Sequence, residues 1–125
     1  MLNPTAQQRI FLAVEPVDMR GGFDRLAGRV RTSGLDLYAG HLFVFISRRK
    51  THLKVLTWDG SGLVVLYKRL GEGRFVVPGR ETTAGTAPLS AEDFATLLRG
   101  PDKASVRRSF PRKPGTTGID DSKKV

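Results

Sequence analysis

The sequence contains no cysteine among its 125 residues. This absence excludes disulfide bonds, thiolate nucleophiles and zinc sites built on cysteine ligands. It is compatible with a reducing cytoplasm, where we expect the protein to reside. The chain also lacks an apolar run of about 20 residues, the length that a membrane-spanning helix needs. No basic leader precedes the short apolar stretch at residues 10–14, so we expect neither a signal peptide nor a membrane partner.

Residues suited to metal binding and catalysis are also sparse. His41 and His52 are the two histidines, and they do not form a pair with metal-ligand spacing. Ser61, in the segment WDGSG, lacks the G-x-S-x-G frame of a hydrolase nucleophile, and Asp59–Gly60 is typical of a hairpin turn. We therefore expect a non-enzymatic protein without metal or cofactor. A nuclease is the less favoured alternative, because scattered carboxylates can converge on metal ions.

Positive charge, by contrast, is abundant. The chain carries 21 lysines and arginines against 12 aspartates and glutamates, which gives a net charge of +9. Such an excess favours a polyanionic partner, which is DNA, RNA or an acidic membrane surface. The alternative is a basic protein whose charge serves solubility alone.

The apolar pattern predicts a single α+β domain over residues 1–100. Residues 10–14 predict a short strand, and residues 17–30 have apolar side chains at helical spacing, with Asp18 as the expected N-cap. Residues 79–88 read as a polar loop. Residues 90–99 predict a second helix, which begins at Ser90 and ends at Gly100 and Pro101 with a buried stripe of Phe94, Leu97 and Leu98.

Residues 41–78 contain four β-rich runs, HLFVFIS, THLKVLTW, LVVLYKRL and RFVVP, separated by short polar turns. Short connections make neighbouring strands antiparallel. We therefore predict a mostly antiparallel, meander-type sheet of about five strands packed with two helices. Hairpins centred on Arg49–Lys50 and Gly60–Ser61 would pair Phe43 with Leu56, Phe45 and Tyr67 with Lys54, Val65 with Leu56, and Leu63 with Trp58.

Both faces of this sheet are apolar in the predicted register. We expect the two helices to cover one face, and the other face to be closed by curling into a small barrel or by self-association. The sequence does not fix the oligomeric state. We interpret the aromatic residues of one face as core rather than as a platform for stacking bases; they are Phe43, Phe45, Trp58 and Tyr67.

The segment ISRRKTHLKV places cations at the first hairpin. Arg48, Arg49 and Lys50 would lie at its tip, followed by Lys54, and each could contact a DNA phosphate with release of counterions. The predicted meander places Lys68, Arg69 and Arg74 at the same end of the sheet. The alternative is a solvated turn that discourages aggregation of sheet edges.

Residues 101–125 have a different composition. They contain seven lysines and arginines against three aspartates, with prolines at 101, 111 and 114 and few apolar residues. This composition predicts a disordered basic tail. Within it, Arg107, Arg108, Arg112 and Lys113 form a further candidate group for DNA backbone contact. The alternative is a solubilising end without a target.

Three blocks of the chain resemble a known family. They are VDMRGGFDRLAGRV, GHLFVFISRRKTHLKVLTWDGSGLVVLYKRLGEGRFVVP and LSAEDFATLLRG. In this order they resemble TnpB, the accessory protein encoded by the second open reading frame of bacterial transposable elements of insertion sequence family sixty-six. The resemblance covers residues 8–113; Thr57 and residues 114–125 depart from the pattern.

The resemblance implies a non-catalytic accessory factor for DNA transposition, encoded beside a separate transposase. It implies DNA binding, contact with the transposase of the same element, or both. The alternative is a protein-interaction adaptor without direct DNA binding, in which an uncovered apolar face of the sheet docks the partner.

Overall fold

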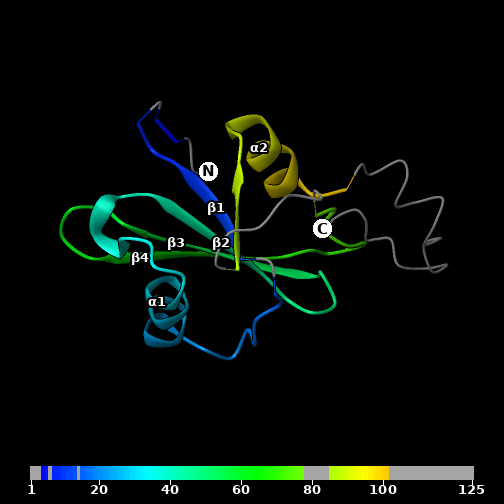
Figure 1. Cartoon of the computed structure of the whole chain (residues 1–125). Helices are drawn as coiled ribbons and strands as arrows, with labels where there is room; N and C mark the ends of the chain where they lie inside the picture. Colours follow the sequence, from blue (N-terminus) through cyan, green and yellow to red (C-terminus); the bar gives the residue numbers. More distant parts are fainter. Residues whose placement is uncertain (1–3, 6, 14, 78–84, 102–125) are drawn as a thin grey trace, which may run out of the picture.

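The computed structural model describes residues 4–5, 7–13, 15–77 and 85–101. Its elements are, in chain order, β1 (Ile10–Ala13), α1 (Phe23–Thr32), the 3-10 helix η1 (Leu37–Ala39), β2 (Leu42–Ile46), β3 (His52–Trp58), β4 (Leu63–Arg69), β5 (Thr86–Leu89) and α2 (Ala91–Arg99). The five strands form one sheet in the order β4-β3-β2-β1-β5 (Figure 1). The predicted α+β class with two α-helices is confirmed. No helix in the described part of the chain is long and apolar enough to cross a membrane.

The sheet is mixed. Strands β2, β3 and β4 form the predicted antiparallel meander, and β5 pairs antiparallel with β1. However, β1 and β2 run parallel, whereas the sequence pattern indicated a mostly antiparallel sheet. The connection between them explains the difference, because α1 and η1 return the chain to the other end of the sheet before β2 begins.

The predicted register of both hairpins is confirmed. Phe43 pairs with Leu56 and Phe45 with Lys54 across the first hairpin. Across the second, β4 pairs with β3 as expected, with Trp58 opposite Leu63, Leu56 opposite Val65 and Lys54 opposite Tyr67. The centre of the first hairpin is therefore Arg49–Lys50, and all three cations of the tip are exposed.

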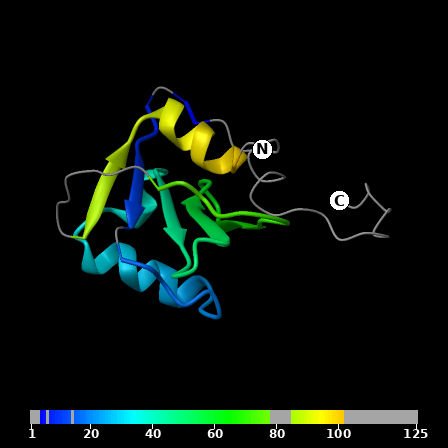
Figure 2. The same ribbon diagram turned by 90° about the vertical axis from the view of Figure 1, so that its right-hand side faces the viewer.

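The two helices cover opposite faces of the sheet (Figures 1 and 2). On one face, Leu26, Ala27 and Val30 of α1 form a core with residues that include Phe11, Phe43, Phe45 and Leu56. On the other face, Phe94, Leu97 and Leu98 of α2 form a core with residues that include Leu42, Val44, Leu53 and Val55. The expectation that both helices share one face is therefore wrong. One amphipathic helix on each face is the arrangement that removes both apolar surfaces from water.

The last predicted strand and the predicted polar loop are corrected by the structure. Residues 74–77 are not a strand, although Phe75 is 1% exposed and belongs to the core beneath α2. The fifth strand is instead Thr86–Leu89, which begins within the stretch read as a loop and ends one residue after it. Pro88 weakens the sequence pattern, but proline is tolerated here because β5 is an edge strand.

The N-terminal end of α2 lies where the sequence predicted it, whereas the N-terminal end of α1 does not. Ser90 caps α2 as expected, since its hydroxyl accepts a hydrogen bond from the Asp93 N–H at 3.0 Å. Helix α1 begins later than predicted, at Phe23, and its N-cap is Gly22. Asp18 instead accepts a bond from the Arg20 N–H in the preceding turn. Apart from Pro101, the predicted tail lies outside the described residues.

Candidate nucleic-acid interface

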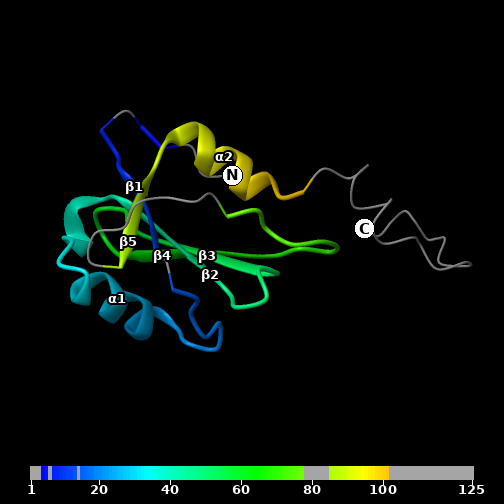
Figure 3. The ribbon, with the colours of Figure 1, turned by 45° about the vertical axis from the view of Figure 1, so that its right-hand side comes forward.

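Two segments distant in the sequence meet at one end of the sheet. Arg69 pairs with His52, the Leu70 N–H donates to the Thr51 carbonyl at 3.0 Å, and the Phe75 N–H donates to the Lys50 carbonyl at 2.7 Å. The turn at residues 47–51 and the stretch at residues 69–75 therefore lie side by side (Figure 3). Their exposed cations define a surface that we call the basic end: Arg48, Arg49, Lys50, Arg69 and Arg74.

The five cations of the basic end form no ion pair among the described residues, although the exposed Glu72 lies in the same stretch as Arg69 and Arg74. The ion pair of the described residues lies outside the basic end and joins Arg20 Nη2 to Asp18 Oδ2 at 2.8 Å. None of the five cations of the basic end lies within ion-pair distance of a described carboxylate. An exposed cluster of like charges creates a positive potential that attracts anions.

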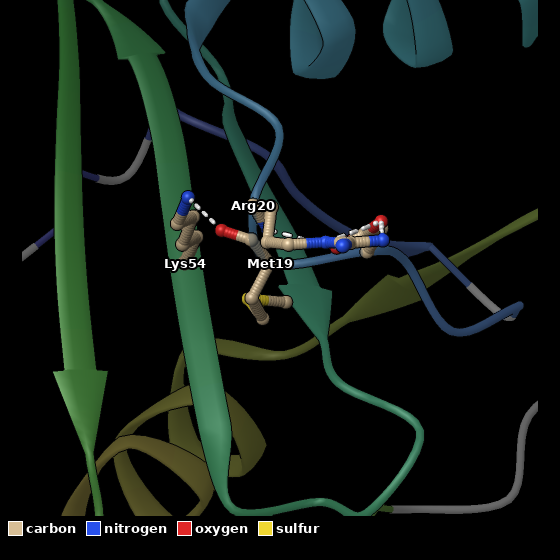
Figure 4. A network of polar contacts seen from close by, with 4 residues as sticks. Met19, Arg20 and Lys54 are labelled. Atoms are coloured by element: carbon tan, nitrogen blue, oxygen red, sulfur yellow. Dashed lines mark hydrogen bonds and ion pairs between the residues drawn. The ribbon is translucent and has the colours of Figure 1, made fainter.

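Lys54 does not belong to this surface. It is 9% exposed, and its ammonium donates a hydrogen bond to the Met19 carbonyl at 2.8 Å (Figure 4). It also donates one to the Gly21 carbonyl at 2.9 Å. The same nitrogen lies 4.9 Å from the centre of the Tyr67 ring. Lys54 thus connects β3 to the segment that leads into α1. Lys54 was expected to contact phosphate, but in the structure its ammonium has this structural role instead.

Lys68 has a similar role at the other helix. Its ammonium donates to the carbonyl of Leu98 at 2.6 Å, and the side chain is half-buried. Carbonyls in the last turn of a helix lack partners within the helix and carry partial negative charge. Lys68 therefore stabilises the C-terminal end of α2 on the sheet, in the vicinity of the basic end.

A groove of about 400 Å³ adjoins the basic end. It separates the segment before α1 from the first hairpin and is lined by Pro16, Val17, Asp18, Met19, Ser47, Arg48, Arg49, Thr51 and His52. Asp18 is the acidic residue in this lining. Hydrogen bonds from the Arg20 side chain and N–H hold the pKa of the Asp18 carboxyl well below its usual range, so its charge is offset by an adjacent guanidinium.

Aromatic rings also lie beside the basic end. Phe43 and Phe45 are buried, as expected for core residues. Tyr67 is 53% exposed, and its ring stacks on that of His52 with centroids 5.9 Å apart. The interpretation of Tyr67 as core is therefore wrong. The alternating pattern places it on the correct face, but its exposure follows from the position of β4 at the edge of the sheet.

Other predicted features add no further site among the described residues. No group of three or more histidine, aspartate and glutamate side chains is placed there to hold a metal ion. The Ser61 hydroxyl hydrogen bonds Asp59 Oδ1, which also accepts from the N–H groups of Ser61 and Gly62, so these residues form a turn. Arg107, Arg108, Arg112 and Lys113 lie outside the described residues.

The fold and the basic end together define a small, basic α+β protein with a surface suited to polyanions. Comparison with known families is consistent with the resemblance found in the sequence. The family described as IS66 Orf2 like protein matches residues 8–108, and the chain belongs to this family of transposition-associated accessory proteins. The family is not known for enzymatic activity.

Two relatives from Sinorhizobium fredii (strain NBRC 101917 / NGR234) match nearly the whole chain. The protein y4jC is 36% identical over 115 residues, which cover 91% of this chain and 97% of y4jC. The protein y4hO is 41% identical over 117 residues, which cover 92% of this chain and all of y4hO. Both relatives are described as uncharacterized, and no solved structure matches the chain.

Proposed function

We propose that this protein assists transposition by binding the DNA backbone through the basic end. The observation that carries the proposal is the set of five exposed cations that share one end of a rigid sheet and lack carboxylate partners in the described structure. Guanidinium and ammonium groups on such a surface contact phosphates, which fix position on DNA but carry no sequence information. The protein would act in the cytoplasm, where it would meet the DNA of the element.

The number of cations sets the expected salt dependence. Each neutralised phosphate of duplex DNA contributes about −0.9 to the slope of log K against log salt concentration. If all five cations of the basic end contact phosphates, the slope is about −4.5. The tail group, Arg107, Arg108, Arg112 and Lys113, would steepen the slope further if it also binds.

The test compares two variants that lose the same charge at different places on the surface. The variant Arg48→Ala/Arg49→Ala removes two cations from the basic end. The matched control Arg9→Ala/Arg31→Ala removes two exposed arginines elsewhere; Arg9 precedes β1 at the end remote from the hairpin tip. Fluorescence anisotropy with labelled DNA from the ends of the element, at several salt concentrations, measures affinity and slope.

The proposal predicts a slope shallower by about 2 for the basic-end variant than for wild type, because two phosphate contacts are lost. The control should retain the wild-type slope. Equal losses in both variants would mean that net charge, rather than this surface, governs binding. No binding by wild type at low salt would remove the DNA hypothesis.

A second candidate function is that of an adaptor for the transposase, and the edge strand β4 favours it. This strand is seven residues long, contains no proline and has 40% exposed Val64. Every second residue of an antiparallel edge strand directs its N–H and C=O groups outward, where an extended segment of a partner can pair. The candidate partner is the transposase of the same element.

The adaptor function is tested by co-purification with the tagged transposase. A Val64→Lys substitution places a charge on the exposed edge and should abolish co-purification if β4 is the docking strand. The Arg48→Ala/Arg49→Ala variant should retain it. Co-purification that survives Val64→Lys would exclude β4 as the contact.

A further inference from the structure

We infer that the basic end binds single-stranded DNA in preference to duplex DNA, with an unpaired base stacked on Tyr67. This inference rests on the proposed function and specifies the form of DNA that the same surface takes. Its starting point is an aromatic ring that is exposed beside cations, on a face of the sheet where the neighbouring aromatic side chains Phe43 and Phe45 are buried.

The ring of Tyr67 is supported from one side. The His52 ring, at 5.9 Å, and the Lys54 ammonium, at 4.9 Å from the Tyr67 ring centroid, both belong to β3. On its other side, β4 has no neighbouring strand in the described sheet. The ring is therefore positioned by contacts toward the centre of the sheet and accessible from the edge.

These contacts prepare the ring for stacking. The Lys54 ammonium is itself fixed by the Met19 and Gly21 carbonyls, so the cation beneath the ring does not move freely. A cation close to an aromatic ring is attracted to it and restricts its motion. A side chain that is ordered before binding loses less conformational entropy when a ligand stacks on it.

Cations surround this platform. Arg69 lies opposite His52 in the β3–β4 register and two residues from Tyr67 on the same face of β4. His52 in turn lines the groove that carries Arg48 and Arg49 on its wall. A continuous surface thus runs from Tyr67 over His52 into the groove, with arginines on both sides to hold the phosphates that flank a stacked base.

The groove suits the adjoining nucleotide. Apolar atoms of Pro16, Val17 and Met19 line one wall, and Asp18 is paired with Arg20 and so presents a neutralised charge to an incoming phosphate. Alternating cations and aromatic or apolar surface is the arrangement by which proteins bind single strands without sequence preference. A duplex cannot use it, because its bases are already stacked and paired.

The experiment measures anisotropy of labelled dT20 and of a labelled 20-base-pair duplex at the same salt concentration. It compares wild type with Tyr67→Ala, Tyr67→Phe and Tyr38→Ala. Tyr38 is a matched control, because it is 56% exposed and packs on Trp58, at the end of the sheet remote from the basic end. Circular dichroism verifies that each variant is folded.

We expect wild type to bind dT20 more tightly than the duplex. Tyr67→Ala should weaken dT20 binding by about 5- to 150-fold, the loss of one stacked base, and leave duplex binding unchanged. Tyr67→Phe and Tyr38→Ala should bind dT20 like wild type, since each keeps an aromatic ring at position 67.

Two results would overturn the inference. They are equal affinity for dT20 and duplex, and a Tyr67→Ala variant that binds dT20 like wild type. If either result is accompanied by duplex binding with the basic-end salt slope, the proposed function stands while this inference fails. Absence of binding to either DNA at low salt would instead remove both.

Discussion

At the scale of single residues, Lys54 shows how a charge can serve the fold. Its ammonium is nearly buried, and the two carbonyls that it contacts belong to the segment before α1. A buried charged group is tolerated when hydrogen bonds replace its hydration. Lys54 therefore determines how the chain enters α1, and it positions Tyr67 at the same time.

Replacing Lys54 with methionine tests this role. Lys54→Met keeps the length of the side chain but leaves the Met19 and Gly21 carbonyls without this donor. We expect the free energy of unfolding to fall by about 1–3 kcal/mol, as measured by urea denaturation. Arg48→Met, at an exposed position, should change it by less than about 0.5 kcal/mol. Equal effects of the two substitutions would show that the bonds of Lys54 do not matter for stability.

Asp18 predicts a pH dependence of stability. The hydrogen bonds from Arg20 lower the pKa of Asp18 in the folded protein below the value of 3.8 expected for a free carboxyl, so folding favours the ionised form. This contribution is complete well above pH 3.8 and is lost as the pH falls through the lower, folded-state pKa.

Urea denaturation of wild type and Asp18→Asn from pH 7 to pH 2 measures the contribution. The stability difference should be present at pH 7, decrease below pH 4 and be smaller in high salt, because the pair is exposed. Arg20→Gln should reproduce the profile of Asp18→Asn. A difference that does not vary with pH would show that the carboxylate charge is not involved.

At the scale of elements, the first hairpin combines tight geometry with charge. Lys50 has a positive φ of 62°, and its N–H donates to the Ser47 carbonyl at 2.9 Å. The Ser47 hydroxyl accepts bonds from the N–H groups of Thr51 and His52. The turn is thus internally bonded, and a residue other than glycine in the left-handed region costs about 1–2 kcal/mol.

Lys50→Gly separates the charge of the turn from its geometry. Glycine adopts this φ without strain, so we expect the free energy of unfolding to stay constant or rise by up to about 1 kcal/mol. The slope of DNA binding against salt should become shallower by about 1 at the same time. Arg49→Gly, at a position without positive φ, should remove one charge and lower stability. A marked loss of stability in Lys50→Gly would contradict the assigned strain.

At the scale of the whole molecule, the sheet separates two cores. The cluster beneath α1 and the cluster beneath α2 have no residue in common. The stretch that ends in Phe75 fills part of the second core and carries Arg74 to the basic end. Packing on the α2 side therefore positions Arg74 of the basic end. The turn of the β2–β3 hairpin supplies Arg48, Arg49 and Lys50.

Two substitutions on opposite faces test this independence. Val30→Ala lies in the core under α1 and Leu98→Ala in the core under α2. Each should lower the free energy of unfolding, Leu98→Ala by about 2–5 kcal/mol, through lost burial and the cavity left behind. The double variant should equal the sum within about 0.5 kcal/mol in urea denaturation. A larger deviation would show that the sheet couples the two faces.

Local sequence patterns predicted much of this structure, because helix capping and turn geometry depend on residues that are close in the sequence. Ser90, Phe94, Leu97 and Leu98 specify α2 through capping and helical spacing. The turn residues around Arg49 and Gly60 specify both hairpins and their register. Arg48, Arg49 and Lys50 therefore had to share a hairpin tip, and the length of the meander strands had to bring Arg69 to the same end.

Non-local pairing explains what local patterns missed. Thr86–Leu89 becomes a strand because β1 offers an unpaired edge, and the segment 74–77 is not paired as a strand although Phe75 is buried. Lys54 appeared to be one more cation of the hairpin, since nothing near it in the sequence shows that the carbonyls of Met19 and Gly21 lie beside it. Tyr67 appeared to be core, since alternation assigns a face but not an edge.

The sequence by itself determined three strands of the meander, the cap and apolar stripe of α2, and the clustering of cations at a hairpin, because each depends on neighbours along the chain or across a short turn. The tertiary structure alone decided which face each helix covers, the parallel pairing of β1 with β2, and which cations face solvent. These outcomes depend on contacts between segments tens of residues apart, where burial of apolar surface and satisfaction of hydrogen bonds are settled for the molecule as a whole.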